Sequence, residues 1–302
     1  MKAANIVYIF SIVTVLAVMA SPMCHALSLK TILQEPCVSI TVNNDEAYLL
    51  TGSSQIIKVS SDGSTQKLKP NLDLDRTEPE YSKAEDLAIL NNYLIFTIGG
   101  SPELQICNLG RMDENSRKLS IPGLAKDDRP IRLQRCGDNL LVETFNGLKK
   151  LFRFSPEALV EIGQFEGILA GSANDKPLRV QVSGNPEKPS EWKVTSGKDT
   201  KSLFSIVSAN KSENILDLRV VGYDKNHNLF CLLTQGPAEQ NTSTWLIKAK
   251  SGKVISREKF FPVITQAMTK SEALSDSGIL FAVRSNSESK DNGWGTVHIQ
   301  KP

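Results

Sequence analysis

Six charged residues lie where strand-like segments begin, and side chains at such positions can surround a common axis and bind a ligand. They are Glu85, Asp86, Arg132, Arg135, Asp217 and Arg219. Ca²⁺ takes about six to eight oxygen ligands, and carboxylates are prominent among them. Glu85, Asp86 and Asp217 are therefore the candidate ligands of a divalent cation. Because the set is mixed in sign, ion pairing among these residues is the alternative interpretation.

Other catalytic patterns are missing from the sequence. It contains no Gly-rich phosphate loop, GxSxG elbow, HExxH motif or EF-hand loop. His227 and His298 could be ligands or an acid–base couple, but a polar turn and strand filling explain them more simply. No CxxC pair or Cys/His cluster suggests structural zinc. We therefore predict no catalytic residue and no cofactor, apart from the candidate Ca²⁺ site.

Trp294 is the candidate for contact with a partner, because it lies in a loop flanked by glycines, Asp291 to Gly295. An exposed tryptophan at the rim of a fold would mark contact with a protein or a glycan. We expect Trp192 and Trp245 to pack within the fold or at its rim.

Tyr48 to Leu68 shows the structural unit that would position these residues. Its three strand-like runs are Tyr48–Thr51, Gln55–Val59 and Gln66–Leu68, and glycine-containing turns separate them. Asp62-Gly63 between hydrophobic runs is a strong hairpin signal, because glycine supplies the positive φ that the turn needs.

The same unit recurs along the chain, as up to four strands with a polar turn before the second. The second strands begin at Tyr48, Tyr93, Leu140, Leu178, Leu229 and Leu280. A spacing of about 40 to 50 residues with four strands per unit is typical of a β-propeller.

The ends of the chain complement each other. The sixth unit lacks a fourth strand, while Leu27–Leu33 is a spare strand, and we predict that it pairs with Thr296–Gln300. We therefore predict an all-β fold, a six-bladed β-propeller closed by its N-terminal strand. A pair of β-sandwiches is the alternative, because short strands with frequent turns also describe sandwiches.

The first 26 residues have the pattern of a secretory signal peptide. Lys2 precedes the apolar run Ile6 to Ala20, and small residues lead to a cleavage site after Ala26. We predict a signal peptide over 1–26, a propeller domain over 27–302 and a secreted or periplasmic protein with no stable membrane span. An uncleaved membrane anchor is the alternative. The formal net charge of +2 gives no indication of nucleic-acid binding.

Four cysteines remain after the predicted cleavage, Cys37, Cys107, Cys136 and Cys231. In an oxidising compartment they allow three connectivities. We expect Cys107–Cys136 first, since both would lie on neighbouring units. Buried free thiols are the alternative.

Two short motifs resemble known propeller repeats. Gln55 to Gly63 is similar to the strand–turn core of NHL-type secreted propellers, and Trp245 to Val254 to the blade motif of quinoprotein-like propellers. Lys248 and Ser251 depart from the second pattern, so a bound quinone is not implied. A cation held by carboxylates on the axis would resemble the site of gluconolactonase-type lactonases.

The sequence therefore predicts an exported, soluble propeller that acts as a protein- or glycan-binding scaffold. The alternative function is a lactonase-like hydrolase or lyase that uses a divalent cation on the axis.

Overall fold

The computed structural model describes residues 29–43, 46–60, 64–74, 82–173, 176–185, 188–196, 202–207, 214–223, 226–236, 243–260, 270–274, 278–282 and 295–300. Every regular element in these ranges is a β-strand, and none of them contains a helix long and apolar enough to cross a membrane. The predicted signal peptide and Trp294 lie outside the described residues.

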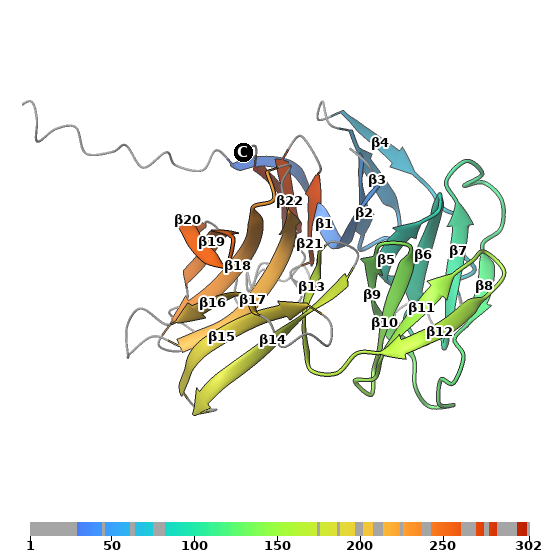
Figure 1. Ribbon diagram of the computed structural model, residues 1–302. Helices are drawn as coiled ribbons and strands as arrows, with labels where there is room; N and C mark the ends of the chain where they lie inside the picture. The colour runs from blue at the N-terminus through green and yellow to red at the C-terminus, as the bar shows by residue number, and fades with distance from the viewer. Residues whose placement is uncertain are drawn as a thin grey trace, which may run out of the picture.

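Four sheets have four strands each, and their strands follow one another in chain order (Figure 1). The second sheet holds β5 (Ala84–Leu90), β6 (Tyr93–Ile98), β7 (Glu103–Asn108) and β8 (Arg117–Ser120). The third holds β9 (Pro130–Cys136), β10 (Asn139–Thr144), β11 (Lys149–Phe154) and β12 (Leu159–Gln164). The fourth holds β13 (Ile168–Ala173), β14 (Lys176–Asn185), β15 (Lys188–Ser196) and β16 (Ser202–Val207). The fifth holds β17 (Asn214–Tyr223), β18 (Leu229–Gly236), β19 (Ser243–Lys250) and β20 (Lys253–Phe260).

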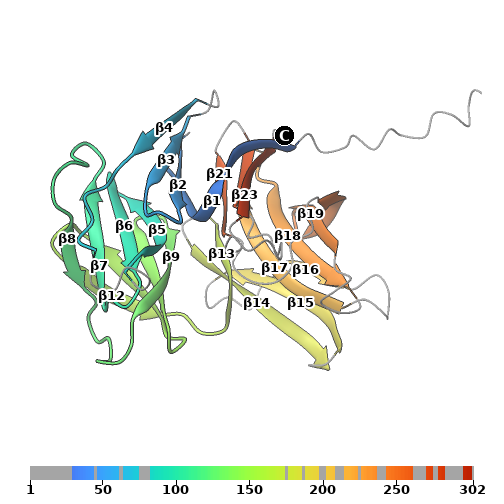
Figure 2. The same ribbon diagram turned by 180° about the vertical axis from the view of Figure 1, so that it is seen from behind.

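The first sheet is different, because one long strand joins both ends of the described chain. Its order is β21-β22-β23-β1-β2-β3-β4. These strands are β1 (Leu29–Asn43), β2 (Glu46–Thr51), β3 (Ile56–Val59), β4 (Thr65–Leu68), β21 (Lys270–Leu274), β22 (Gly278–Ala282) and β23 (Gly295–Gln300). The first half of β1 pairs with β23, from Leu29 with Gln300 to Leu33 with Val297. Its second half pairs with β2, and Figure 2 shows β23 beside β1.

The fold is an all-β propeller with five blades, and the predicted count of six separate blades is wrong. Two groups of strands that the sequence presents as separate units share β1 and form one seven-stranded sheet. The inner strands β1, β5, β9, β13, β17 and β21 contact one another in that order, and β21 also contacts β1.

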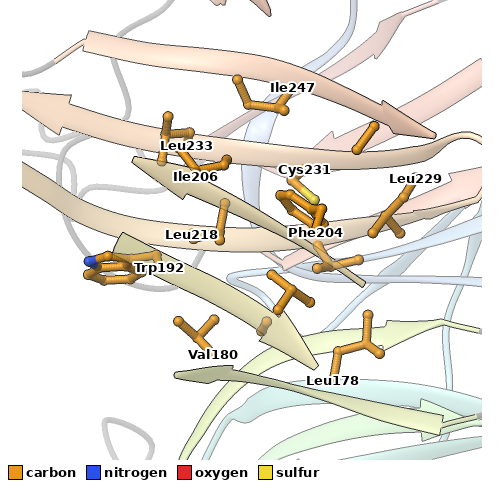
Figure 3. Close-up of a cluster of buried hydrophobic side chains, with 14 of the residues drawn as sticks. Leu178, Val180, Trp192, Phe204, Ile206, Leu218, Leu229, Cys231, Leu233 and Ile247 are labelled. Atoms are coloured by element: carbon orange, nitrogen blue, oxygen red, sulfur yellow. The ribbon is translucent and has the colours of Figure 1, made fainter. Parts of the chain in front are cut away.

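The hydrophobic core is divided into layers between neighbouring sheets. One layer, drawn in Figure 3, packs Leu178, Trp192 and Phe204 of the fourth sheet against Leu218 and Cys231 of the fifth. Similar clusters join the first sheet to the second and the second to the third. In these layers neighbouring sheets therefore cover each other's faces, as the blades of a propeller do.

A recurring irregularity in the inner strands positions the candidate site. The register shifts just before Ser39 in β1, Asp86 in β5 and Asp217 in β17, and β9 has the same shift just before Arg132. A bulge adds one residue and turns the following side chain. These four polar residues therefore occupy equivalent positions in four inner strands.

Candidate functional site

Asp86 is a buried carboxylate that connects three inner strands. It is 5 % exposed. Its Oδ1 accepts hydrogen bonds from the Ser39 hydroxyl of β1 and from the N–H of Leu87 at 2.9 Å. Its Oδ2 accepts one from the N–H of Leu133 in β9 at 2.6 Å. Because both oxygens are engaged by protein donors, Asp86 acts here as a clamp between strands.

Glu85, the neighbouring candidate, points to a different partner. Its Oε2 lies 2.7 Å from a guanidinium nitrogen of Arg129, in the loop that leads into β9. Arg129 also stacks on the ring of Phe145, with its central carbon 5.5 Å from the ring centroid. Glu85 therefore takes part in a surface chain of contacts that ends on an aromatic ring.

Arg132 and Arg135 make their own local contacts. Arg132 donates to Glu143 on the paired strand at 3.2 Å, and Lys149 reaches the other oxygen of Glu143 at 3.4 Å. Arg135 donates to the carbonyl of Gly137 at 3.2 Å. A second, longer contact of Arg135 reaches the carbonyl of Val42 in β1 at 3.5 Å.

Asp217 and Arg219 form a pair within β17. The Asp217 carboxylate accepts from Nε of Arg219 at 3.0 Å and from the N–H of Leu218 at 2.9 Å. Arg219 also donates to the carbonyl of Leu169 in β13 at 3.0 Å. Asp217 thus repeats the bond that Asp86 makes to the following N–H, in another sheet.

The three candidate cation ligands do not gather at one point. Glu85 and Asp86 lie in β5, Asp217 lies in β17, and those two strands are not neighbours in the circuit of inner strands. Within the described ranges, no group of three His, Cys, Asp or Glu residues could hold a metal ion. His227 is exposed in a turn, with φ of 58°.

The predicted Cys107–Cys136 disulfide is wrong. Cys107, Cys136 and Cys231 are buried, and no disulfide joins any two of them. Cys107 packs with the cluster between the first two sheets, whereas Cys136 belongs to a cluster with Leu141 and Phe165. Burial raises the pKa of the Cys107 thiol to about 11. The side chain of Cys37 lies outside the described residues.

Trp192 and Trp245 pack as expected. Trp192 is 8 % exposed and belongs to the layer between the fourth and fifth sheets. The ring of Trp245 is covered by the guanidinium of Arg257, 4.3 Å from its centroid. Neither ring therefore offers the open face that sugar binding by a tryptophan requires, and a glycan partner finds no support in the described residues.

Phe145 is the functional candidate that the sequence did not reveal. It is 65 % exposed and lies at the turn between β10 and β11. Its N–H bonds the carbonyl of Arg129 at 2.8 Å, which places it at the end of the propeller where the inner strands begin. We call this end the proximal face. Two further apolar side chains are exposed where β11 and β13 begin, Leu148 at 36 % and Ile168 at 49 %.

Asp128 fixes the turn that carries Phe145. This residue is 5 % exposed, and its Oδ1 accepts from the N–H of Arg129 at 2.8 Å and of Asn146 at 3.1 Å. Burial acts to raise the pKa of Asp128, but the hydrogen bonds that its carboxylate accepts hold that pKa below its usual value. The exposed ring is therefore held in place by an ionised carboxylate. A Thr-Phe-Asn-Gly turn in the sequence gives no separate signal of this role.

No family model and no curated protein matches the sequence. Solved structures do match. A chain of the structure "Crystal Structure of Mitotic Checkpoint Complex" has a TM-score of 0.51 and 10 % identity, covering 92 % of this chain and 90 % of that one. A putative oxidoreductase (glucose dehydrogenase) of Thermus thermophilus has a TM-score of 0.50 and 11 % identity, covering 91 % of this chain and 99 % of that one.

A structure described as YCF48 bound to D1 peptide has a TM-score of 0.48 and 12 % identity, covering 89 % of this chain and 94 % of that one. The two likenesses with TM-scores of 0.50 and 0.51 agree with the β-propeller fold. At these identities they show the fold alone, and the function must be argued from this chain's own surface.

Proposed function

We propose that this protein is a protein-binding propeller that engages its partner through the proximal face, with Phe145 as the anchor. The observation that carries the proposal is that a large aromatic ring is exposed, yet held in one place. Asp128 fixes its turn and Arg129 stacks on its ring. Aromatic residues and arginines are the side chains most enriched at the energetic centres of protein interfaces.

Burying Phe145 is expected to contribute enough free energy of binding to anchor a partner. A phenylalanine buries about 150–250 Å² when it is covered completely. At 65 % exposure, about 100–160 Å² remains to be covered. At about 25 cal/mol per Å², this burial contributes about 2.5–4 kcal/mol to the free energy of binding, equivalent to roughly 70- to 900-fold in affinity.

Support for the alternative function, a cation-dependent hydrolase, is weaker. Its three candidate ligands each have protein partners, and Asp217 lies on a strand that is not next to the strand of the other two in the circuit of inner strands. The polar side chains of the inner strands instead hold neighbouring strands together.

The test is selection of binding peptides on the purified protein, for example from a phage-displayed library, followed by measurement of their affinities. Phe145→Ala is expected to lower the affinity for the selected peptides by roughly 70- to 900-fold. Val160→Ala is the matched control, because Val160 is 56 % exposed on the outer strand β12, away from the proximal face. Equal losses in the two variants, or no loss with Phe145→Ala, would overturn the proposal.

We further propose that the protein is exported, on the basis of the basic start, the apolar run and the small residues near Ala26. Mass spectrometry of the protein from its own cells tests this proposal. A mature N-terminus at Leu27 in an extracytoplasmic fraction is expected, and an intact N-terminus in the cytosol would contradict it.

A further inference from the structure

The outer strand β12 (Leu159–Gln164) has one edge that no described strand pairs with. It is the last strand of the third sheet, and its other edge pairs with β11 (Figure 1). Leu159 is its one buried residue, and four of its six residues are exposed. An edge strand presents a row of backbone N–H and C=O groups that can pair with another chain. β12 can therefore accept a further strand unless some feature protects it.

The usual protection of an edge is missing from β12. Lysines, prolines and covering segments are the common forms of such protection. The outer strands β4, β8 and β20 carry the exposed lysines Lys67, Lys118 and Lys253, and β16 contacts β20. β12 contains no lysine, arginine or proline, and the carboxylate of Glu161, its single charged residue, lies 2.8 Å from Nζ of Lys150 on β11. The edge of β12 is therefore open, and its own charge is already neutralised.

Two β-branched side chains of β12 face solvent. Val160 is 56 % exposed and Ile162 is 43 % exposed. Leu159 to Glu161 pair in regular register with β11, and the register then shifts at Ile162. A bulge of this kind re-aims a side chain and interrupts the ladder. The edge therefore suits a short extended segment whose apolar side chains cover Val160 and Ile162.

Two acidic residues lie just beyond the ends of β12. Glu157 is in the turn before the strand and Glu166 is in the connection after it. Both are exposed, and neither forms an ion pair in the part of the chain that the structure describes. Arg153 of β11 is exposed opposite Val160, so it places a positive charge beside the middle of the strand. An extended ligand with basic residues near its ends and none in its middle matches this arrangement of charges.

A second copy of the chain matches the edge poorly. Glu157 and Glu166 lie at equal distances along the chain from the middle of β12. Antiparallel pairing of two β12 strands would therefore bring Glu157 of one copy beside Glu166 of the other, at both ends of the interface. Like charges directly opposite one another destabilise a pair of strands. Charge thus favours a basic partner over self-association.

We propose that β12 binds an extended, basic segment of a partner protein by strand addition. Backbone hydrogen bonds give the affinity of such a complex, while contacts with Val160 and Ile162 and the charges at the two ends give its specificity. Glu157 and Glu166 are nine positions apart, which corresponds to about 30 Å of extended chain. The basic residues of the partner segment are therefore expected about nine positions apart. The proposal does not depend on Phe145, which lies on the proximal face.

Titration calorimetry on the full chain tests the proposal with a decapeptide that has lysine at both ends and four Thr-Val repeats between them. The control decapeptide has glutamate at both ends and the same repeats. We expect the lysine peptide to bind at least tenfold more tightly than the glutamate peptide. Hydrogen exchange followed by mass spectrometry gives the second readout. The lysine peptide is expected to slow the exchange of backbone amides in residues 159–164, because strand addition gives the outward N–H groups acceptors.

Substitutions in the protein locate the binding. Val160→Lys is expected to lower the affinity for the lysine peptide roughly tenfold, because it removes an apolar contact and adds a like charge. Val254→Lys is the matched control, since Val254 is 43 % exposed on another outer strand, β20, and its change should leave the affinity unchanged. The double substitution Glu157→Gln and Glu166→Gln is expected to abolish the preference for lysine over glutamate ends. Phe145→Ala should have no effect on this binding, so this proposal and the proposed function can fail separately.

Four outcomes would overturn the proposal. They are failure of the lysine peptide to bind, equal binding of both peptides, equal loss in the two valine variants, and binding without slower exchange in residues 159–164. A concentration-dependent dimer that Val160→Lys dissociates would identify a second copy as the occupant of β12, and the proposal would then fail as well.

Discussion

Replacing Asp86 tests whether the inner strands are held together by a buried carboxylate. Asp86→Ala removes the acceptor for the Ser39 hydroxyl and for the Leu133 N–H. Ser39 is 1 % exposed and Leu133 is fully buried, so water cannot readily replace the lost oxygens. Hydrogen bonds to a charged group contribute about 1.5–3 kcal/mol each, and a buried donor without its acceptor is costly.

Two such bonds between strands predict a loss of about 3–6 kcal/mol in the free energy of unfolding for Asp86→Ala. Asp86→Asn keeps one acceptor oxygen and replaces the other with an amino group, so about half that loss is expected. A loss of this size is a large fraction of the stability of a typical domain, about 5–15 kcal/mol.

The assay is urea unfolding followed by tryptophan fluorescence, with free energies extrapolated to water. Asp138→Ala is the control, because Asp138 is an exposed acid in the turn after β9, and its change should stay within about 0.5 kcal/mol. If both Asp86 variants lose less than about 1 kcal/mol, the clamp between β1, β5 and β9 contributes little and the reasoning is refuted.

Three further predictions concern backbone, charge and thiol. Gly171→Ala is expected to lower the free energy of unfolding in urea by about 2–4 kcal/mol. The φ of Gly171 is +133°, and a new Cβ would lie 2.7 Å from the Val220 carbonyl oxygen. Gly163→Ala is the control and should be near neutral, because a Cβ there meets open space. The hydrogen bond from Lys58 holds the pKa of Glu46 below its usual value, so its stabilisation should be present at neutral pH and disappear as pH falls through that lowered pKa. Urea unfolding of the unsubstituted protein and of Glu46→Gln from pH 3 to 7 checks this. If the free energy of unfolding falls equally in both proteins as the pH is lowered, the prediction is contradicted. Iodoacetamide should label Cys107 only after unfolding, as peptide mass spectrometry would show, since burial raises the pKa of its thiol to about 11.

Much of the fold could be predicted because each unit carries local signals. The runs Tyr48–Thr51 and Gln55–Val59 correspond to β2 and β3, since period-two alternation and turn residues act over short distances. The weak fourth unit also has its four strands where the pattern indicates them. The number of blades cannot be predicted from such local signals. It depends on whether one strand pairs with a single neighbour or, like β1, continues and pairs with strands of two units.

One inner strand escapes prediction for a chemical reason. From the sequence, the first strand of the sixth unit is expected at Ile264–Met268, but that segment lies outside the described residues. The strand that pairs with β22 is β21, Lys270–Leu274, whose sequence Lys-Ser-Glu-Ala-Leu has weak strand propensity. Pairing with a neighbour overrides local preference in such a segment.

The candidate site is harder to predict than the fold. The pattern correctly places Asp86 and Asp217 near the beginnings of inner strands, but a sequence does not show which backbone N–H groups will meet a carboxylate. The exposure of Phe145 depends on how its turn protrudes from the sheet. Hydrophobicity alone predicts that this side chain is buried, which is wrong.

The pairing of β1 with both β2 and β23 has a consequence for biosynthesis. A ribosome delivers β1 long before β23, so the first half of β1 waits for its partner until β23 has been synthesised. Contacts between such distant segments form slowly, and an unpaired strand is prone to intermolecular association meanwhile. Nascent molecules therefore need protection of this strand until β23 has emerged.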